Sequence, residues 1–123
     1  MFTIEEANAL LSTIEPLLGE LLERRARVVS MRHELGPVLE DLHSNVGSLA
    51  ATEMAREFEK IQRLAARIQS HGCYLKDTNA GLVDFLTEID GREVFLCWRY
   101  GEPRVAFFHE LHTGFNERQP VEV

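Results

Sequence analysis

The sequence contains only two cysteines, Cys73 and Cys97, among 123 residues. Two thiols cannot form a disulfide framework, and by themselves they cannot supply the four ligands of a structural zinc site. Residues 2–6 lack the cationic leader and the apolar run of a secretory signal. We therefore expect a cytoplasmic protein in which both thiols are reduced.

Long apolar runs and an excess of basic residues are also missing. No stretch approaches the roughly 18 apolar residues of a membrane span, so no membrane association is expected. The 13 lysines and arginines are outnumbered by 20 aspartates and glutamates, which gives a net charge of −7. This charge disfavours general nucleic-acid binding. The one basic cluster, residues 24–32, is interleaved with glutamates and is interpreted as a solvated helix face.

The motifs of several common enzyme classes are absent. The chain has no Gly-x-Ser-x-Gly elbow, no Gly-x-Gly-x-x-Gly fingerprint and no Gly-x-x-x-x-Gly-Lys phosphate loop. The sequence therefore predicts neither a serine-hydrolase site nor a dedicated nucleotide-binding fold. It assigns no enzymatic activity.

A long amphipathic helix is predicted at the N-terminus. Thr3 and Glu6 have the spacing of a capping box, so the helix should begin at about Ile4. Apolar residues then recur at steps of three and four, which is the spacing of one helix face. This stripe comprises Ala7, Leu10, Leu11, Ile14, Leu17, Leu18, Leu21, Val28, Met31 and Leu35.

Two prolines interrupt the helical pattern. Pro16 removes one backbone donor, which predicts a kink near Ser12. Gly36-Pro37 is a stronger break and predicts that the first helix ends near Glu34. A second helical stretch can open at Pro37 and can be split by the turn-like residues 44–47.

The last helix of this half is predicted from about Ala50 to His71-Gly72. Its apolar face comprises Met54, Phe58, Ile61, Leu64, Ala65 and Ile68. Gly72 suits the position that follows a helix end. The helical half of the chain thus covers about residues 3–71.

After Gly72 the apolar period changes to two, which is typical of strands. Asp90-Gly91 separates two alternating runs and predicts a hairpin with a two-residue type I′ turn. Such a turn pairs Ile89 with Arg92 and sets the register of residues 82–99. The predicted core face carries Val83, Phe85, Thr87, Val94, Leu96 and Trp98, whereas the other face is mixed.

The remaining strands are less regular. A first strand is expected at residues 73–76, followed by a turn at residues 77–81, and a third main strand at residues 104–109 whose register is open by one residue. No periodicity predicts structure after residue 111, although Phe115 suggests that the tail folds back. The expected architecture is one α+β domain with a β half of about residues 73–111, a meander of three or four strands, and an irregular tail of residues 112–123.

Polar residues are dense in the β half, which makes it the candidate site. They are Lys76, Asp77, Asp84, Arg99, Glu102, His109, Glu110 and Arg118. Asp84 interrupts an apolar run and must find a partner, because an unpaired buried carboxylate is costly. An ion pair with Arg99 or Lys76 is the favoured interpretation, and a catalytic or ligand role is the alternative.

The sequence His109-Glu110-x-His112 resembles a divalent-metal cluster, since imidazole and carboxylate are good ligands for zinc, iron or manganese. Neighbours on a strand point to opposite faces, so His109 could share an ion only with a residue such as Asp84 or His112. A hydrogen-bonded structural histidine is the favoured interpretation, and metal binding is the alternative.

Cys97 lies opposite Asp84 in the predicted hairpin. A neighbouring carboxylate raises the pKa of a thiol and suppresses the reactive thiolate. We therefore interpret Cys97 as a structural residue rather than a nucleophile.

Several segments together resemble domain-of-unknown-function family 2203, a bacterial family. They are residues 2–11, 75–77, 81–85 and 91–102, with later matches at residues 108–110, 114–115 and 118–120. The resemblance implies a small stand-alone protein with a helical N-terminal half, and it carries no established activity. It also directs attention to Lys76, Asp77, Asp84, Trp98, Glu102, His109 and Arg118.

The expected function is a non-catalytic interaction or adaptor protein. Residues 4–34 would span roughly 45 Å as a helix, which is longer than so small a β half can cover. We therefore expect a homo-oligomer formed through this first helix. The alternative is a metal- or small-ligand-binding domain, which could be an enzyme, with its site in the β half.

Overall fold

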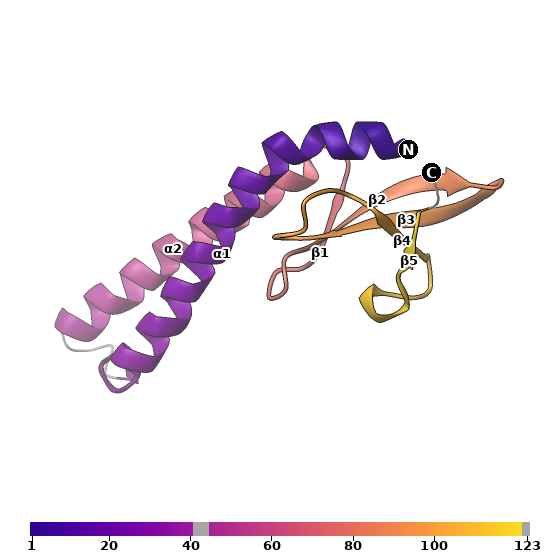
Figure 1. Cartoon of the computed structure of the whole chain (residues 1–123). Helices are drawn as coiled ribbons and strands as arrows, with labels where there is room; N and C mark the ends of the chain where they lie inside the picture. The colour runs from indigo at the N-terminus through magenta and orange to yellow at the C-terminus, as the bar shows by residue number, and fades with distance from the viewer. Residues whose placement is uncertain (41–44, 122–123) are drawn as a thin grey trace.

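The computed structural model describes residues 1–40 and 45–121. Two helices are followed by five strands and one short 3-10 helix (Figure 1). The elements are α1 (Ile4–Glu40), α2 (Asn45–Gln69), β1 (Tyr74–Asp77), β2 (Leu82–Ile89), β3 (Arg92–Arg99), β4 (Phe107–Glu110), η1 (Phe115–Glu117) and β5 (Gln119–Pro120). The predicted α+β class is confirmed.

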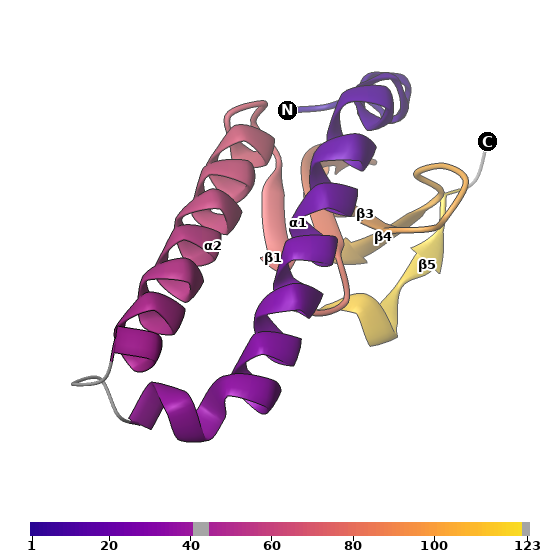
Figure 2. The same ribbon diagram turned by 90° about the vertical axis from the view of Figure 1, so that its left-hand side faces the viewer.

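The five strands form one antiparallel sheet in the order β1-β2-β3-β4-β5. The two helices run side by side and lie on one side of this sheet, while their far ends extend beyond it (Figures 1 and 2). The other face of the sheet is not covered by α1 or α2. Residues of the C-terminal segment lie on that second face.

The start of α1 follows the predicted capping box. The Glu6 N–H donates to Thr3 Oγ1 at 3.1 Å, and the Thr3 N–H donates to Glu6 Oε1 at 2.9 Å. The first turns of α1 run in a different direction from the rest of the helix (Figure 1). α1 is therefore bent in its N-terminal part, as a kink before Pro16 would produce.

The predicted end of the first helix at Glu34 is wrong. α1 continues through Gly36-Pro37 to Glu40, and its last turns change direction (Figure 2). Proline removes one hydrogen bond and crowds the preceding turn, which can bend a helix rather than end it. α2 then begins at Asn45 instead of about Ala50, because the supposed turn residues 45–47 are helical. Residue 44 lies outside the described residues.

The predicted hairpin is confirmed. Asp90 and Gly91 have φ values of 51° and 77°, the positive region that a type I′ turn requires. Ile89 pairs with Arg92, and the register continues to Leu82 opposite Arg99. Six residues of the predicted core face are buried, whereas Ile89 and Arg92, which share that face at the hairpin tip, are half-buried and exposed.

Three predictions in the β half are wrong in detail. The first strand covers residues 74–77 rather than 73–76. β4 begins at Phe107 rather than at residue 104, because the backbone N–H and carbonyl of Val105 bond to the side chain of Asn8 in α1, at 2.8 and 3.1 Å. The tail is not irregular throughout, since η1 forms and β5 pairs with β4, which makes five strands instead of three or four.

Much of the apolar stripe of α1 is buried within the chain. Leu18 and Leu21 are fully buried and Val28 is nearly so. As expected, α1 is longer than the β half can cover, and α2 packs along it (Figure 1). Glu57 of α2 strengthens this pairing through ion pairs with Arg24 at 3.1 Å and Arg27 at 3.6 Å. The arginine cluster is therefore only partly a solvated face.

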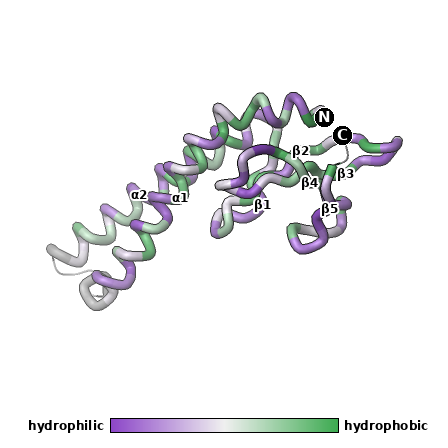
Figure 3. Tube along the Cα trace, viewed as in Figure 1, coloured by the Kyte–Doolittle hydropathy of each residue, from purple (hydrophilic) through white to green (hydrophobic). Residues whose placement is uncertain are grey.

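Hydropathy follows this arrangement. Hydrophilic residues gather at the tip of the β2–β3 hairpin and along the C-terminal segment, while the strands beneath the helices are mainly hydrophobic (Figure 3). Within residues 1–40 and 45–121, no helix is long and apolar enough to cross a membrane. Cys73 and Cys97 are both free and buried.

Candidate metal site

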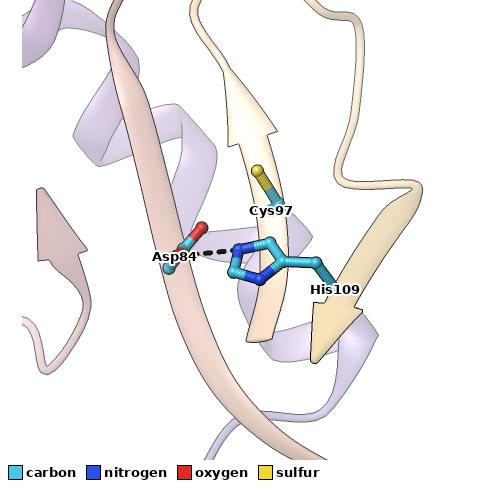
Figure 4. Close-up of side chains that lie close together, drawn as sticks. All are labelled: Asp84, Cys97 and His109. Atoms are coloured by element: carbon cyan, nitrogen blue, oxygen red, sulfur yellow. Dashed lines mark hydrogen bonds and ion pairs between the residues drawn. The ribbon is translucent and has the colours of Figure 1, made fainter. Parts of the chain in front are cut away.

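Three side chains with metal-binding atoms meet on the face of the sheet that lies away from the helices. Asp84 of β2, Cys97 of β3 and His109 of β4 project toward one another (Figure 4). One ligand atom from each lies within 4.8 Å of the other two. The three residues are 3%, 1% and 4% exposed.

Strand register explains why these residues meet. Asp84 is directly opposite Cys97, and His109 is opposite Phe95, which is two residues before Cys97 on the same face. Residues two apart on a strand share a face, so His109 lies diagonally across from Cys97. The register of β4, which the sequence left open by one residue, therefore places His109 on the same face as Asp84.

The hydrogen bonds of His109 define where its protons lie. Its Nδ1 is 2.8 Å from the backbone carbonyl oxygen of Glu110. A carbonyl oxygen can only accept, so Nδ1 carries a proton and donates it. In the neutral ring the lone pair is then on Nε2.

Nε2 of His109 lies 3.0 Å from Oδ2 of Asp84. A ring lone pair and an ionised carboxylate are both acceptors, so contact at this distance requires a cation between them. A proton on the line between the two atoms satisfies this requirement. A metal ion about 2.0 Å from each atom would instead lie to the side of that line, with Nε2 and Oδ2 as neighbouring ligand atoms.

Cys97 is unsuited to act as a nucleophile. Burial raises the pKa of its thiol to about 12, and the Asp84 carboxylate adds to the increase, while Arg118 opposes it. Neither ring nitrogen of His109 is available as its base, because one binds the Glu110 carbonyl and the other faces Asp84. The prediction that a carboxylate suppresses this thiolate is confirmed.

The predicted ion pair of Asp84 with Arg99 or Lys76 is wrong. Asp84 pairs with His109 instead. The ammonium of Lys76 lies 4.7 Å from the ring centroid of Phe95, and the guanidinium of Arg99 lies 5.5 Å from that of Phe115. Both cations stack on aromatic rings at the surface, and they leave the buried carboxylate to the histidine.

A cavity opens above the three side chains. It has a volume of about 240 Å³, and its lining includes Asp84, Cys97, His109, Lys76 and Asp77. Asp77 also orders the turn after β1, since its Oδ1 accepts the N–H groups of Asn79 and Ala80. Four of the eight predicted site residues therefore surround one space, namely Lys76, Asp77, Asp84 and His109.

Arg118 and Glu102 form a support beside Cys97. Two nitrogens of Arg118 bond to the two carboxylate oxygens of Glu102 at 2.9 and 3.0 Å. The guanidinium lies 4.3 Å from the ring centroid of Phe107 and 4.0 Å from that of Phe115. This pair holds the C-terminal segment against the sheet next to the cavity.

The Glu102 carboxyl has a lowered pKa. Burial acts to raise it, but hydrogen bonds from Arg118 and from the Arg99 N–H outweigh that effect. A lowered folded-state pKa stabilises the fold above the ordinary pKa of glutamate, about 4.3, and this contribution disappears as pH falls through the lower value.

We therefore expect Glu102→Gln to lower the free energy of unfolding at pH 7 by about 1 to 3 kcal/mol. The variant should also lose less of its remaining stability than the wild type between pH 5 and the acid range. Urea unfolding at a series of pH values measures both effects. Glu88→Gln, which removes an exposed carboxylate of the same sheet, is the control and should leave the profile unchanged.

The other four predicted site residues do not line the cavity, and of these only Glu102 and Arg118 form the pair beside it. The carboxylate of Glu110 pairs with Arg92 at 2.9 and 3.3 Å, and only its backbone carbonyl contacts His109. Arg99 is exposed. His112, the other possible ligand partner of His109, is also exposed and is not part of the cluster.

Cys97 is the ligand candidate that the sequence reasoning missed. The predicted hairpin register already placed it opposite Asp84, so the geometric information was present. Cys97 was interpreted as structural because its thiol is a poor nucleophile beside a carboxylate. A poor nucleophile can still bind a metal, and the sequence analysis did not include that role. Phe95 and Phe115, which also line the cavity, could not be assigned without the β4 register and the path of the tail.

Comparison with known proteins identifies the family. The sequence profile of the family described as "Uncharacterized conserved protein (DUF2203)" matches residues 1–121. The chain belongs to this family. No curated protein and no solved structure matches it. The resemblance noted in the sequence is confirmed, and the family description adds no activity.

Proposed function

We propose that this DUF2203 protein binds a divalent metal ion of the zinc class through His109 Nε2, an Asp84 carboxylate oxygen and Cys97 Sγ. The observation that carries the proposal is that one ligand atom from each of these three buried side chains lies within 4.8 Å of the other two, with Nε2 of His109 and Oδ2 of Asp84 3.0 Å apart. The Glu110 carbonyl fixes the proton on Nδ1, as a backbone carbonyl commonly does for a metal-binding histidine.

The donor set suits zinc. Imidazole, thiolate and carboxylate are the three ligand types that zinc accepts, and three protein ligands with a fourth open position are typical of zinc sites that bind a further molecule. Tetrahedral zinc holds nitrogen and oxygen ligands about 3.3 Å apart, so the His109 and Asp84 atoms need little movement. Cys97 must approach more closely and release its proton to the metal.

The surrounding charges also favour a dication. Asp84 and the Cys97 thiolate would together neutralise two positive charges. Arg118 lies beside Cys97, but its guanidinium is already paired with Glu102 through two hydrogen bonds. It therefore opposes a bound cation less than an unpaired arginine would.

Cobalt(II) titration of the metal-free protein tests this proposal. We expect one ion per chain, visible bands of a low-symmetry four-coordinate site, and a near-ultraviolet band from thiolate-to-cobalt charge transfer. Cys97→Ser should remove the charge-transfer band and weaken binding by roughly tenfold or more.

Cys73→Ser is the matched control, since Cys73 is the other buried thiol and its Sγ lies against the Ile68 carbonyl at 3.2 Å. It should retain the band. A charge-transfer band that survives Cys97→Ser, or that never forms in the wild type, would remove Cys97 from the site.

We further propose that the chain self-associates through its helices. The specific observation is that Val29 of α1 is 58% exposed and Phe58 of α2 is 42% exposed. Both line one groove of about 250 Å³, together with Val28, Ile61 and Arg25. Adjacent exposed apolar side chains are typical of protein interfaces, and a second copy of this face is the proposed occupant.

The double variant Val29→Glu/Phe58→Glu is expected to reduce the molar mass measured by light scattering to that of one chain. The introduced charges would be buried against each other in a symmetric interface. Leu49→Glu, which changes an exposed residue outside the groove, should not alter the mass. A wild type that is monomeric at every concentration would refute self-association.

A further inference from the structure

The cavity above the proposed metal position has an apolar wall. Phe95, Phe115, Leu82 and Leu111 contribute to its lining, and the three ligand side chains form part of the same lining. Phe115 comes from the C-terminal segment and Phe95 from β3, so the wall is assembled from distant parts of the chain. A metal-bound molecule in this space would contact aromatic and aliphatic carbon.

Lys76 is the positively charged side chain of the cavity lining that could bind a ligand. Its ammonium lies 4.7 Å from the ring centroid of Phe95 and 5.4 Å from that of Tyr74, and it takes part in none of the ion pairs found within residues 1–40 and 45–121. The neighbouring Asp77 carboxylate is directed to the backbone N–H groups of its own turn. Lys76 therefore supplies a positive charge at the cavity.

The cavity is small and open to solvent on one side. Its volume of about 240 Å³ is below the roughly 300 Å³ at which the sites of drug-sized ligands start, so a small molecule suits it better.

We propose that the cavity binds a small organic monocarboxylate with an apolar body. The inference rests on the proposed metal site. Asp84 and the Cys97 thiolate neutralise the dication, and Asp77 Oδ1 accepts the N–H groups of its own turn, which leaves the open metal position and the Lys76 ammonium as the groups that a carboxylate would meet. The carboxylate is held by the metal ion and Lys76, and the apolar body packs against Phe95 and Phe115.

Benzoate is the probe for this inference. Titrating it into the cobalt-loaded protein is expected to change the visible cobalt bands in a saturable manner, with one benzoate per chain. Benzyl alcohol, a neutral molecule of similar size, should bind more than about tenfold more weakly, because it cannot pair with Lys76.

Lys76→Met keeps an unbranched side chain over Phe95 and removes the charge. It should weaken benzoate binding by roughly tenfold without altering cobalt affinity. Lys60→Met is the matched control, since Lys60 belongs to α2 and pairs with Glu57 at 3.9 Å, and this variant should bind benzoate as the wild type does.

The outcomes separate the two proposals. Cobalt bands that form but do not respond to benzoate, or a Lys76→Met variant with unchanged benzoate affinity, would overturn the carboxylate inference and leave the metal site standing. Failure of cobalt to bind at all would overturn both.

Discussion

His109→Gln is expected to weaken zinc binding by more than about a hundredfold while the protein stays folded. The glutamine amide can still donate hydrogen bonds to the Asp84 carboxylate and to the Glu110 carbonyl, so the buried polar groups keep partners. It cannot supply the imidazole lone pair. Loss of a direct ligand should exceed the 10- to 100-fold cost of losing a residue that only orients one.

Competition with a chromophoric chelator measures this affinity, and circular dichroism reports the fold. His112→Gln is the matched control, because His112 is an exposed histidine three residues after His109 and does not belong to the cluster. It should bind zinc as the wild type does. Equal affinity in the wild type and His109→Gln would exclude His109 as a ligand.

Alanine is a poorer choice at position 109. It would leave the buried Asp84 carboxylate without its partner, which typically costs 3 to 5 kcal/mol in the metal-free protein. A loss of metal in His109→Ala could then reflect unfolding.

The second large effect is expected from Leu18→Ala, which should lower the free energy of unfolding by about 2 to 5 kcal/mol. Leu18 is fully buried in the core formed by both helices and the sheet. Truncation removes buried apolar surface and leaves a cavity that the surrounding side chains cannot fully close. Chemical denaturation monitored by the fluorescence of Trp98 measures the change.

Leu49→Ala is the control for Leu18→Ala, because Leu49 is 71% exposed on α2 and should change stability by no more than about 0.5 kcal/mol. The stability lost in Leu18→Ala should not depend on protein concentration. A loss of stability relative to the wild type that changes with protein concentration would instead assign Leu18 to an intermolecular interface.

The parts of the fold that the sequence predicted are those governed by local chemistry. Asp90-Gly91 tolerates positive φ, so the hairpin and its register followed directly. The Thr3 and Glu6 cap is equally local. The end of α1 was predicted wrongly at Gly36-Pro37. A proline removes the same backbone hydrogen bond whether it bends a helix or ends it, so the sequence does not distinguish the two cases.

The features that escaped prediction depend on contacts between distant segments. The side chain of Asn8 forms hydrogen bonds with the backbone N–H and carbonyl of Val105, 97 positions away. Val105 therefore does not pair with β3, and β4 begins after it. The Arg118–Glu102 pair holds the tail near the sheet where β5 forms. Neither contact leaves a periodic pattern.

The candidate site could be predicted only in part, because it also depends on contacts between distant segments. Asp84 was singled out because a carboxylate inside an apolar run needs a partner, and His109 was one of the residues considered for a shared ion. Which face His109 occupies depended on the register of β4. Cys97 was correctly paired with Asp84, but its contribution becomes evident only when His109 lies beside them.

The most direct test of the central claim is the metal content of protein that carries no histidine tag. Wild type and His109→Gln are saturated with zinc, dialysed together against metal-free buffer, and analysed by inductively coupled plasma mass spectrometry. The proposed site predicts close to one zinc ion per wild-type chain and almost none in the variant. Equal zinc content in the two proteins, or none in either, would contradict it.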